Sequence, residues 1–207
     1  AGFPLVTGSL TAPGGFDEVP AAWRDAARWV DAQGGDDRTL LLPGAAFAEN
    51  RWGRPLDEPW AVLASGSWAV RDLIPLGGNG STRLLDGLDA ALAGSRLPDG
   101  FTTALQRAGI GHLVVRNDLD LRRTGGPAPA TVRRLLATDP RLVRVAAFGP
   151  RVRTADAGGD LRLAPSAGAP PAPGLRQIEV YEVPGATARA TAYPAAGRLL
   201  VGGAAEA

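Results

Sequence analysis

The chain has 207 residues, of which 45% are apolar and 21% charged, and its net charge is +1. This length supports one domain with a hydrophobic core and a smaller appendage. The near-neutral charge gives no electrostatic basis for binding nucleic acid, so we expect no nucleic-acid partner. All 22 basic residues are arginine, which excludes Schiff-base and P-loop lysine chemistry. The absence of cysteine and the single histidine, His112, exclude thiolate and multi-histidine metal sites. We therefore predict no metal site.

The sequence contains no methionine, even at position 1, and we interpret it as a processed product or a part of a longer protein. Its apolar opening, residues 1–6, is much shorter than the roughly 20 residues that a membrane-spanning helix requires. No other stretch is apolar for long enough. We therefore expect no part of the given sequence to cross a bilayer.

The first predicted helix begins near residues 17–20, where acidic residues and a proline suit a first helical turn. Trp23, Ala27 and Val30 then fall on one face, with Trp23 in the core, and the glycines at 34–35 end the helix. The apolar run at residues 38–42 predicts a short strand that is buried on both faces of a parallel sheet.

Periodicity and helix-breaking glycines predict the remaining elements. Two short apolar runs, residues 61–64 and 68–70, fit either a helix or a strand. Helices are predicted at residues 81–94 (capped by Ser81 or Thr82), 99–108 and 130–137, and strands at residues 112–115, 141–148 and 177–183.

The alternation of helices and strands over residues 17–150 predicts an α/β fold in three layers, with a mostly parallel sheet flanked by helices. The last two strands are expected to add an antiparallel edge hairpin. We interpret residues 1–16 as a linker, 17–185 as the α/β domain and 186–207 as the start of a following unit. The stretch at residues 151–175 is rich in proline, glycine and alanine, and we interpret it as a flexible hairpin insertion.

Residues 43–60 follow the first strand and are unusually rich in aromatic and charged groups, which is typical of a recognition loop or of a tight polar network. In the recognition hypothesis, Trp52 is exposed as an aromatic platform and the charged groups bind sugar hydroxyls. In the alternative, the same charges form an internal arginine–carboxylate network, with Trp52 buried and Arg54 paired to Asp57 or Glu58. Our candidate glycan-binding residues are Glu49, Arg51, Trp52, Arg54, Asp57, Glu58, Arg116 and Asp118.

The other motifs also have structural explanations. The glycines of residues 77–82 precede a helix and could hold a phosphate. They match neither G-x-G-x-x-G nor the Walker pattern, so we favour a glycine turn with a helix cap. Asp57 and Glu58 are adjacent in sequence, so they cannot flank one glycosidic bond without a third carboxylate. Glu49 could supply this carboxylate, and an independent hydrolase is therefore kept as an alternative. Arg116–Asp118 sits at a predicted strand end, where ligands bind open α/β sheets and where Asn and Asp also cap loops. His112 fits a structural role, and we assign no catalytic residue.

Six segments of the chain are similar to a known family. They are residues 42–49, 52–59, 67–71, 74–77, 80–86 and 114–120, of which the string Trp-Gly-Arg-Pro-Leu-Asp-Glu-Pro at 52–59 is the most specific. Together they resemble the extracytoplasmic part of the actinobacterial α-(1→3)-arabinofuranosyltransferases, over about residues 8–150 and again near 178–183. The pattern Phe16-Asp17-x-Val19-Pro20-x-x-Trp23 also resembles the segment that follows a membrane helix in these proteins.

The resemblance implies that the parent is a multi-pass membrane glycosyltransferase of the GT-C type, which transfers arabinofuranose from a polyprenyl-phosphate donor to cell-wall arabinan. The catalytic carboxylate of the family is expected in the membrane-embedded half, so no catalytic residue and no cofactor is carried over to this chain. We expect this domain to lie outside the membrane and to support the rest of the parent protein or bind arabinan. The alternatives are a purely structural or protein-interaction module and an independent carbohydrate-active enzyme.

Overall fold

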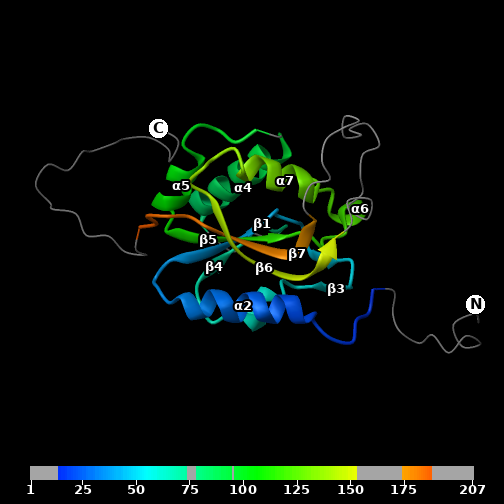
Figure 1. Ribbon diagram of the computed structural model, residues 1–207. Coiled ribbons are helices and arrows are strands. Elements are labelled where there is room, and N and C mark those ends of the chain that lie inside the picture. Colours follow the sequence, from blue (N-terminus) through cyan, green and yellow to red (C-terminus); the bar gives the residue numbers. More distant parts are fainter. Residues whose placement is uncertain (1–13, 74–77, 95, 153–173, 188–207) are drawn as a thin grey trace, which may run out of the picture.

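The computed structural model describes residues 14–73, 78–94, 96–152 and 174–187 (Figure 1). Its helices are α2 (Ala21–Gln33), α3 (Trp60–Leu63), α4 (Asn79–Ala93), α5 (Phe101–Arg107), α6 (Leu121–Thr124) and α7 (Pro129–Leu136). Its strands are β1 (Arg38–Leu42), β2 (Ala48–Asn50), β3 (Gly53–Leu56), β4 (Trp68–Ala69), β5 (Ile110–Arg116), β6 (Val143–Val152) and β7 (Leu175–Glu182).

Five strands form one sheet in the order β4-β1-β5-β7-β6. Strand β1 is parallel to both β4 and β5, whereas β7 runs antiparallel to both β5 and β6. Strands β2 and β3 form a separate antiparallel hairpin. The predicted fold class is therefore confirmed, including the antiparallel pair at one edge of the sheet.

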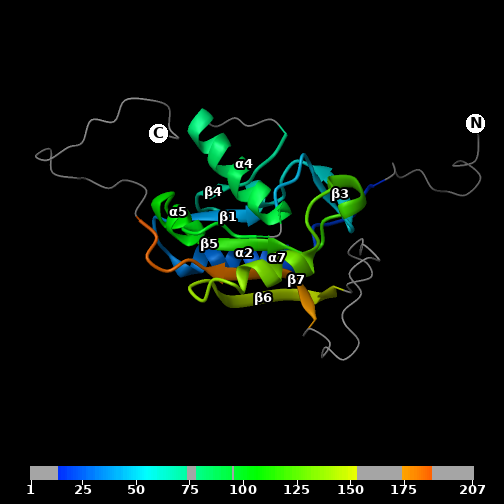
Figure 2. The same cartoon turned by 90° about the horizontal axis from the view of Figure 1, so that it is seen from above.

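Helices cover both faces of this sheet and make three layers (Figures 1 and 2). Helices α4, α5 and α7 lie on one face, over a core that contains Leu92, Leu105 and Leu113. Helices α2 and α3 lie on the other, where Trp23 and Trp60 are fully buried. Strand β5 contributes to both cores because its alternate side chains point to opposite faces, as its nearly continuous apolar run predicts.

Two predicted helix starts were wrong. Pro20 has an extended ψ of 146° and precedes the helix, so α2 begins at Ala21 and the acidic residues before it lie outside the first turn. Helix α4 begins at Asn79, two residues earlier than predicted, and is preceded by Gly78. Thr82 consequently lies inside the first turn, where its hydroxyl donates to the Gly78 carbonyl oxygen at 3.4 Å.

The other predicted bounds agree to within two residues, except that β6 ends at Val152, four residues beyond its predicted end. Gly94 closes α4 as predicted, and the ambiguous runs at residues 61–64 and 68–70 belong to helix α3 and strand β4. Three predictions concern residues that lie wholly or mostly outside the described part of the chain: the linker at 1–16, the insertion at 151–175 and the following unit at 186–207. The first glycine of the 77–82 motif also lies outside it.

Candidate functional site

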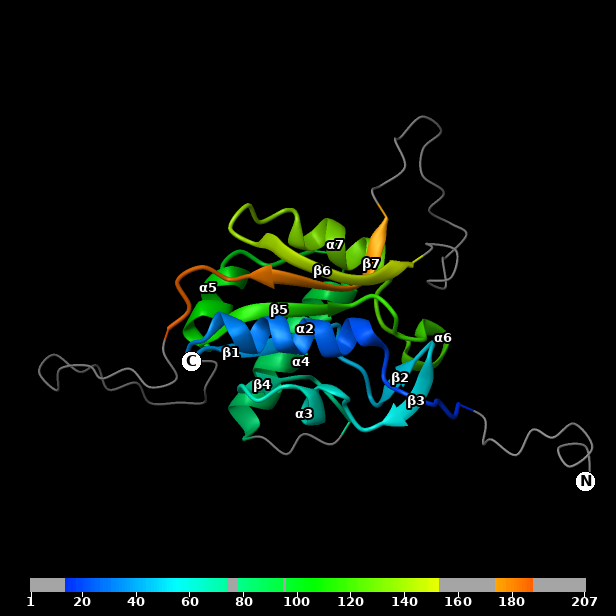
Figure 3. The ribbon, with the colours of Figure 1, turned by 60° about the horizontal axis from the view of Figure 1, so that its bottom comes forward.

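The segments that carry the candidate residues, the β2–β3 hairpin and the turn into α6, lie together at the edge of the sheet where β1 and β5 end (Figure 3). Because these strands are parallel and adjacent, the chain leaves both at the same edge. After β1 it forms the β2–β3 hairpin, and after β5 it forms the turn that leads into α6. Backbone hydrogen bonds join the two loops, from Arg51 N to Asp118 O and from Asp120 N to Glu49 O, each 2.9 Å long.

Asp118 is the centre of this region. Its Oδ2 atom accepts hydrogen bonds from Trp23 Nε1 at 2.9 Å, from Trp52 Nε1 at 2.9 Å and from Gln177 Nε2 at 2.8 Å. Asp118 is 5% exposed, and burial raises the pKa of its carboxyl group, while the hydrogen bond from Trp23 is the largest effect that opposes this rise. The carboxylate therefore joins α2, the hairpin and β7 in one buried contact.

A second buried contact links Arg116 to Glu58. The Arg116 Nη1 atom lies 2.5 Å from Glu58 Oε2, and its Nη2 atom donates to the carbonyl oxygen of Pro43. The guanidinium is 1% exposed and the Glu58 side chain 10%. Burial raises the pKa of Glu58, and the adjacent Arg116 charge opposes the rise. This ion pair fastens the segment after the hairpin to the end of β5.

The other charged candidates divide into one pair and two exposed side chains. Arg54 pairs with Glu49 across the hairpin, with Arg54 Nη2 at 2.6 Å from Glu49 Oε1. The predicted pairing of Arg54 with Asp57 or Glu58 was wrong, because Glu58 turns inward to Arg116 and Asp57 is exposed. Arg51 is also exposed, in the turn of the hairpin. Trp52, expected to be exposed in the recognition hypothesis, is half-buried.

Aromatic packing extends this polar network toward the N-terminal side of the described chain. The Phe16 ring meets Trp52 edge-on with centroids 5.1 Å apart, and Trp52 meets Trp23 at 6.1 Å. Arg54 N donates to Gly14 O at 2.9 Å. A Cβ atom on Gly53 would lie 2.6 Å from Phe16, so the close approach of Phe16 requires a glycine there. Residues 14–16 are therefore held directly on the hairpin.

Sequence reasoning did not anticipate the roles of Phe16 and Gln177, nor the bond from Trp23 to Asp118. Gln177 is 59 positions from Asp118 along the chain, and no local pattern connects the two. Every Glu or Asp of this network is held by side chains from other segments or across the hairpin. Among the described residues, no group of three His, Cys, Asp or Glu side chains could hold a metal ion.

The family model for the N-terminal GT-C domain of α-(1→3)-arabinofuranosyltransferase matches residues 1–207. The chain belongs to this family. The resemblance of its sequence motifs to this family is thereby confirmed.

Two curated arabinofuranosyltransferases are similar to the chain. The α-(1→3)-arabinofuranosyltransferase of Mycolicibacterium smegmatis is 42% identical over 144 residues, and that of Mycobacterium tuberculosis is 39% identical over 147 residues. Each alignment covers 69% of this chain and 10% of the relative, so the chain spans about a tenth of their length.

Solved structures of the arabinofuranosyltransferase AftD from Mycobacteria have the same fold. One matches with a TM-score of 0.73 and 34% identity, over 87% of this chain and 13% of that protein. A structure of an AftD mutant matches with a TM-score of 0.72 and 35% identity. In the present arabinofuranosyltransferase domain, no helix of the described residues has the length and apolar character needed to cross a membrane.

Proposed function

We propose that this chain is a non-catalytic domain of an α-(1→3)-arabinofuranosyltransferase that acts in cell-wall arabinan synthesis. It lies on the extracytoplasmic side of a multi-pass membrane protein and supports the rest of the enzyme. Family membership supports the arabinofuranosyltransferase assignment. The polyprenyl-phosphate arabinose donor belongs to the remainder of the enzyme in this proposal, and this domain contributes no catalytic group.

The anchoring of residues 14–16 on the hairpin is the observation that carries the supporting role. The Asp118 carboxylate fixes Trp52, and Trp52 in turn holds Phe16. The direction in which the chain enters the domain is therefore coupled to the centre of the sheet. In this proposal, the fixed position of residues 14–16 relative to the sheet is the feature that suits the domain to a supporting role.

The internal pairing of the carboxylates supports the non-catalytic role. General acid–base chemistry requires a carboxyl group within reach of substrate. Glu58 and Asp118 are buried and face Arg116, two indoles and an amide, and Glu49 faces Arg54. These groups hold the fold together at the end of the sheet where many α/β enzymes bind their substrates.

The test uses the full-length enzyme in membranes, with Phe16→Ala and Asp118→Asn compared with the control Asp99→Asn, which changes an exposed side chain outside the site. We expect Phe16→Ala to lower arabinofuranosyl transfer severalfold and Asp118→Asn to lower mainly the amount of folded enzyme. The control should match the wild type. A thousandfold loss of transfer per folded molecule in Asp118→Asn would contradict the non-catalytic role. Unchanged transfer in Phe16→Ala would contradict the supporting role.

Arabinan binding by the hairpin is the second candidate function, because Arg51 and Asp57 are exposed beside the half-buried Trp52. Titration with arabinan oligosaccharides, followed by tryptophan fluorescence, tests it. The informative variants are Arg51→Ala and Asp57→Ala, because Trp52→Ala also breaks the bond to Asp118. An absence of saturable change in the wild type would rule this function out.

A further inference from the structure

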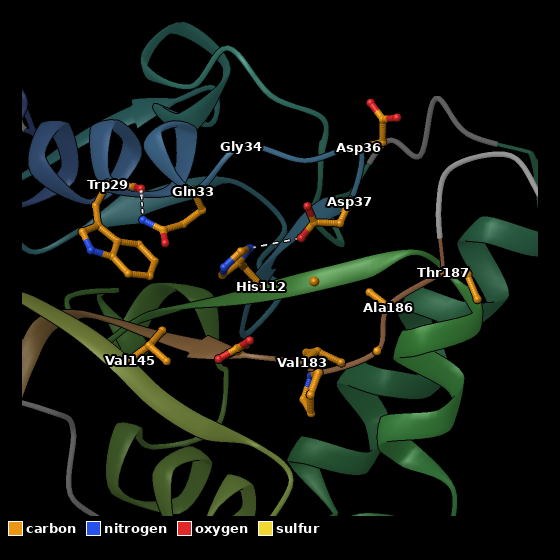
Figure 4. Close-up of a pocket in the computed structure, with 14 residues that line it drawn as sticks. Trp29, Gln33, Gly34, Asp36, Asp37, His112, Val145, Val183, Ala186 and Thr187 are labelled. Carbon is orange, nitrogen blue, oxygen red and sulfur yellow. Dashed lines mark hydrogen bonds and ion pairs between the residues drawn. The ribbon is translucent and has the colours of Figure 1, made fainter.

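A groove of about 680 Å³ lies at the end of the sheet opposite to the Asp118 network (Figure 4). The end of α2 with the turn after it, the start of β5 and the end of β7 form its walls. Its chemically distinctive lining residues are Trp29, Gln33, Asp36, Asp37, His112 and Glu182. The volume falls in the range of pockets that bind small molecules, roughly 300–1,000 Å³.

The centre of the groove is a defined set of contacts around His112. Its Nδ1 atom lies 3.2 Å from Asp37 Oδ2, and its ring meets Trp29 edge-on at 5.9 Å. A Cβ atom at position 111 would lie 1.5 Å from Asp37 Oδ2, so only glycine lets this carboxylate reach the imidazole. The histidine and the indole are therefore fixed relative to one another, as a pre-organised site requires.

Other polar groups beside this centre are available to a ligand. Glu182 is the register partner of His112 on the neighbouring antiparallel strand, which places both side chains on the same face of the sheet. Glu182 and Asp36 are exposed and form no ion pair with any described residue. The Gln33 amide nitrogen donates to Trp29 O at 2.9 Å, and its amide oxygen is left as an acceptor.

The charge of the groove restricts its ligand. Among the described residues, three carboxylates line it and no arginine does. A phosphate or another anion would be repelled, whereas sugar hydroxyls donate well to carboxylate and amide oxygens. The indole of Trp29 adds an apolar surface for the C–H groups of a sugar ring. A cationic ligand could also use the carboxylates and the indole face, so the experiment below includes a cationic probe as the competing outcome.

We propose that this groove binds a neutral saccharide chain, with Trp29 as the apolar platform and Asp36, Glu182 and Gln33 as hydroxyl acceptors. The proposal rests on the proposed function only in the choice of arabinofuranose as the sugar. The groove is separate from the hairpin, so it gives the domain a saccharide contact that is independent of Trp52 and Asp118.

The experiment is a calorimetric titration of purified full-length enzyme with a neutral linear arabinofuranose hexasaccharide. The variants are Trp29→Leu, which keeps an apolar side chain but removes the aromatic face, and the double variant Asp36→Asn with Glu182→Gln. Asp99→Asn is the matched control, because Asp99 is an exposed carboxylate outside both regions. The same hexasaccharide with a terminal phosphate and an arginine-rich peptide serve as anionic and cationic probes.

We expect the wild type and Asp99→Asn to bind the neutral hexasaccharide, and both groove variants to lose one binding site or weaken it at least tenfold. The phosphorylated probe should bind this site at least tenfold more weakly. The double variant changes only exposed side chains, so the test holds even where Trp29→Leu does not fold. The proposal would be overturned if all variants bound the saccharide as tightly as the wild type, or if the phosphorylated probe bound as tightly as the neutral one. It would also be overturned if the groove variants lost binding of the arginine-rich peptide but not of the saccharide. None of these results depends on Phe16 or Asp118, so a failure here is distinguishable from failure of the supporting role.

Discussion

Asp118 joins three segments that are distant in sequence through one carboxylate oxygen. Two of its donors, Trp23 and Gln177, are themselves buried, so their N–H groups cannot hydrogen-bond to water when the carboxylate is removed. A buried donor without an acceptor costs roughly 1–3 kcal/mol, and that cost outweighs the modest gain from one hydrogen bond. The loss of Asp118 should therefore be felt in all three of these segments.

We expect Asp118→Ala to lower the free energy of unfolding of the 207-residue chain by about 3 kcal/mol, because it leaves the N–H donors of Trp23 and Gln177 without an acceptor. Asp118→Asn keeps an acceptor oxygen and should cost less. Urea unfolding measures both, with Asp57→Ala as an exposed control that should stay within about 0.5 kcal/mol of the wild type. A loss below about 1 kcal/mol for Asp118→Ala would show that the donors find other partners.

Tyr181 should make stability depend on pH in the alkaline range. Burial, with the Glu179 carboxylate nearby, raises the pKa of Tyr181 to about 12. The unfolded chain ionises this phenol near pH 10 while the folded chain keeps it neutral. Stability is therefore fully present below about pH 10 and falls as the pH rises toward about 12. Tyr181→Phe should flatten this part of a plot of urea midpoint against pH, and parallel curves for the two proteins would contradict it.

The elements that the sequence predicts well are those whose burial leaves a clear apolar pattern, on one face of a helix or on both faces of a strand. Helix α2 follows from the spacing of Trp23, Ala27 and Val30, and strand β5 from its apolar run, because burial alone selects these patterns. The β2–β3 hairpin was not predicted. Its strands have three and four residues, and contacts from Phe16 and Asp118, distant in sequence, hold it in place.

The place of the candidate residues in the fold was predictable from the sequence, but the partners of their side chains were not. The parallel alignment of β1 and β5 brings Arg116 and Asp118 beside the loop of residues 43–60, as strand ends in an α/β sheet imply. The choice of partner depends on side-chain direction, and the positive φ of 67° at Leu56 changes the chain direction just before Glu58. Sequence spacing carries no signal for such a reversal at a non-glycine residue.

The hairpin should respond to the loss of Trp52 as one unit. In Trp52→Ala we expect amide hydrogen exchange to quicken at least tenfold in β2, β3 and residues 14–16, because Phe16 loses its ring contact and Asp118 one of its donors. Exchange in β6 and β7 should stay at the wild-type rate. Arg51→Ala, which alters an exposed side chain of the same hairpin, is the control. Uniform acceleration throughout the chain would mean that Trp52 stabilises the whole fold and not this element.

The two ends of the sheet carry different chemistry. Where β1 and β5 end, the carboxylates of Glu58 and Asp118 are buried and paired. At the other end, Asp36 and Glu182 stay exposed beside Trp29. Ligands of open α/β sheets commonly bind at the carboxyl ends of the strands. Here the hairpin occupies that edge, and the open groove lies at the opposite one.

We expect the connection between β6 and β7 to be dispensable for the fold. Val152 and Leu175 are register partners at the ends of these antiparallel strands, so a short turn can join them directly. We therefore consider a variant in which a five-residue glycine-containing turn replaces the 22 residues between them. We expect it to keep the fold and to raise the free energy of unfolding by about 1 kcal/mol, because closing a shorter loop costs less entropy. Urea unfolding measures the change, and a five-residue deletion within the same segment is the control, expected to stay within about 0.3 kcal/mol of the wild type. A loss of more than about 2 kcal/mol in the short-turn variant would show that these residues pack on the domain, and the interpretation of 151–175 as a flexible insertion would then be wrong.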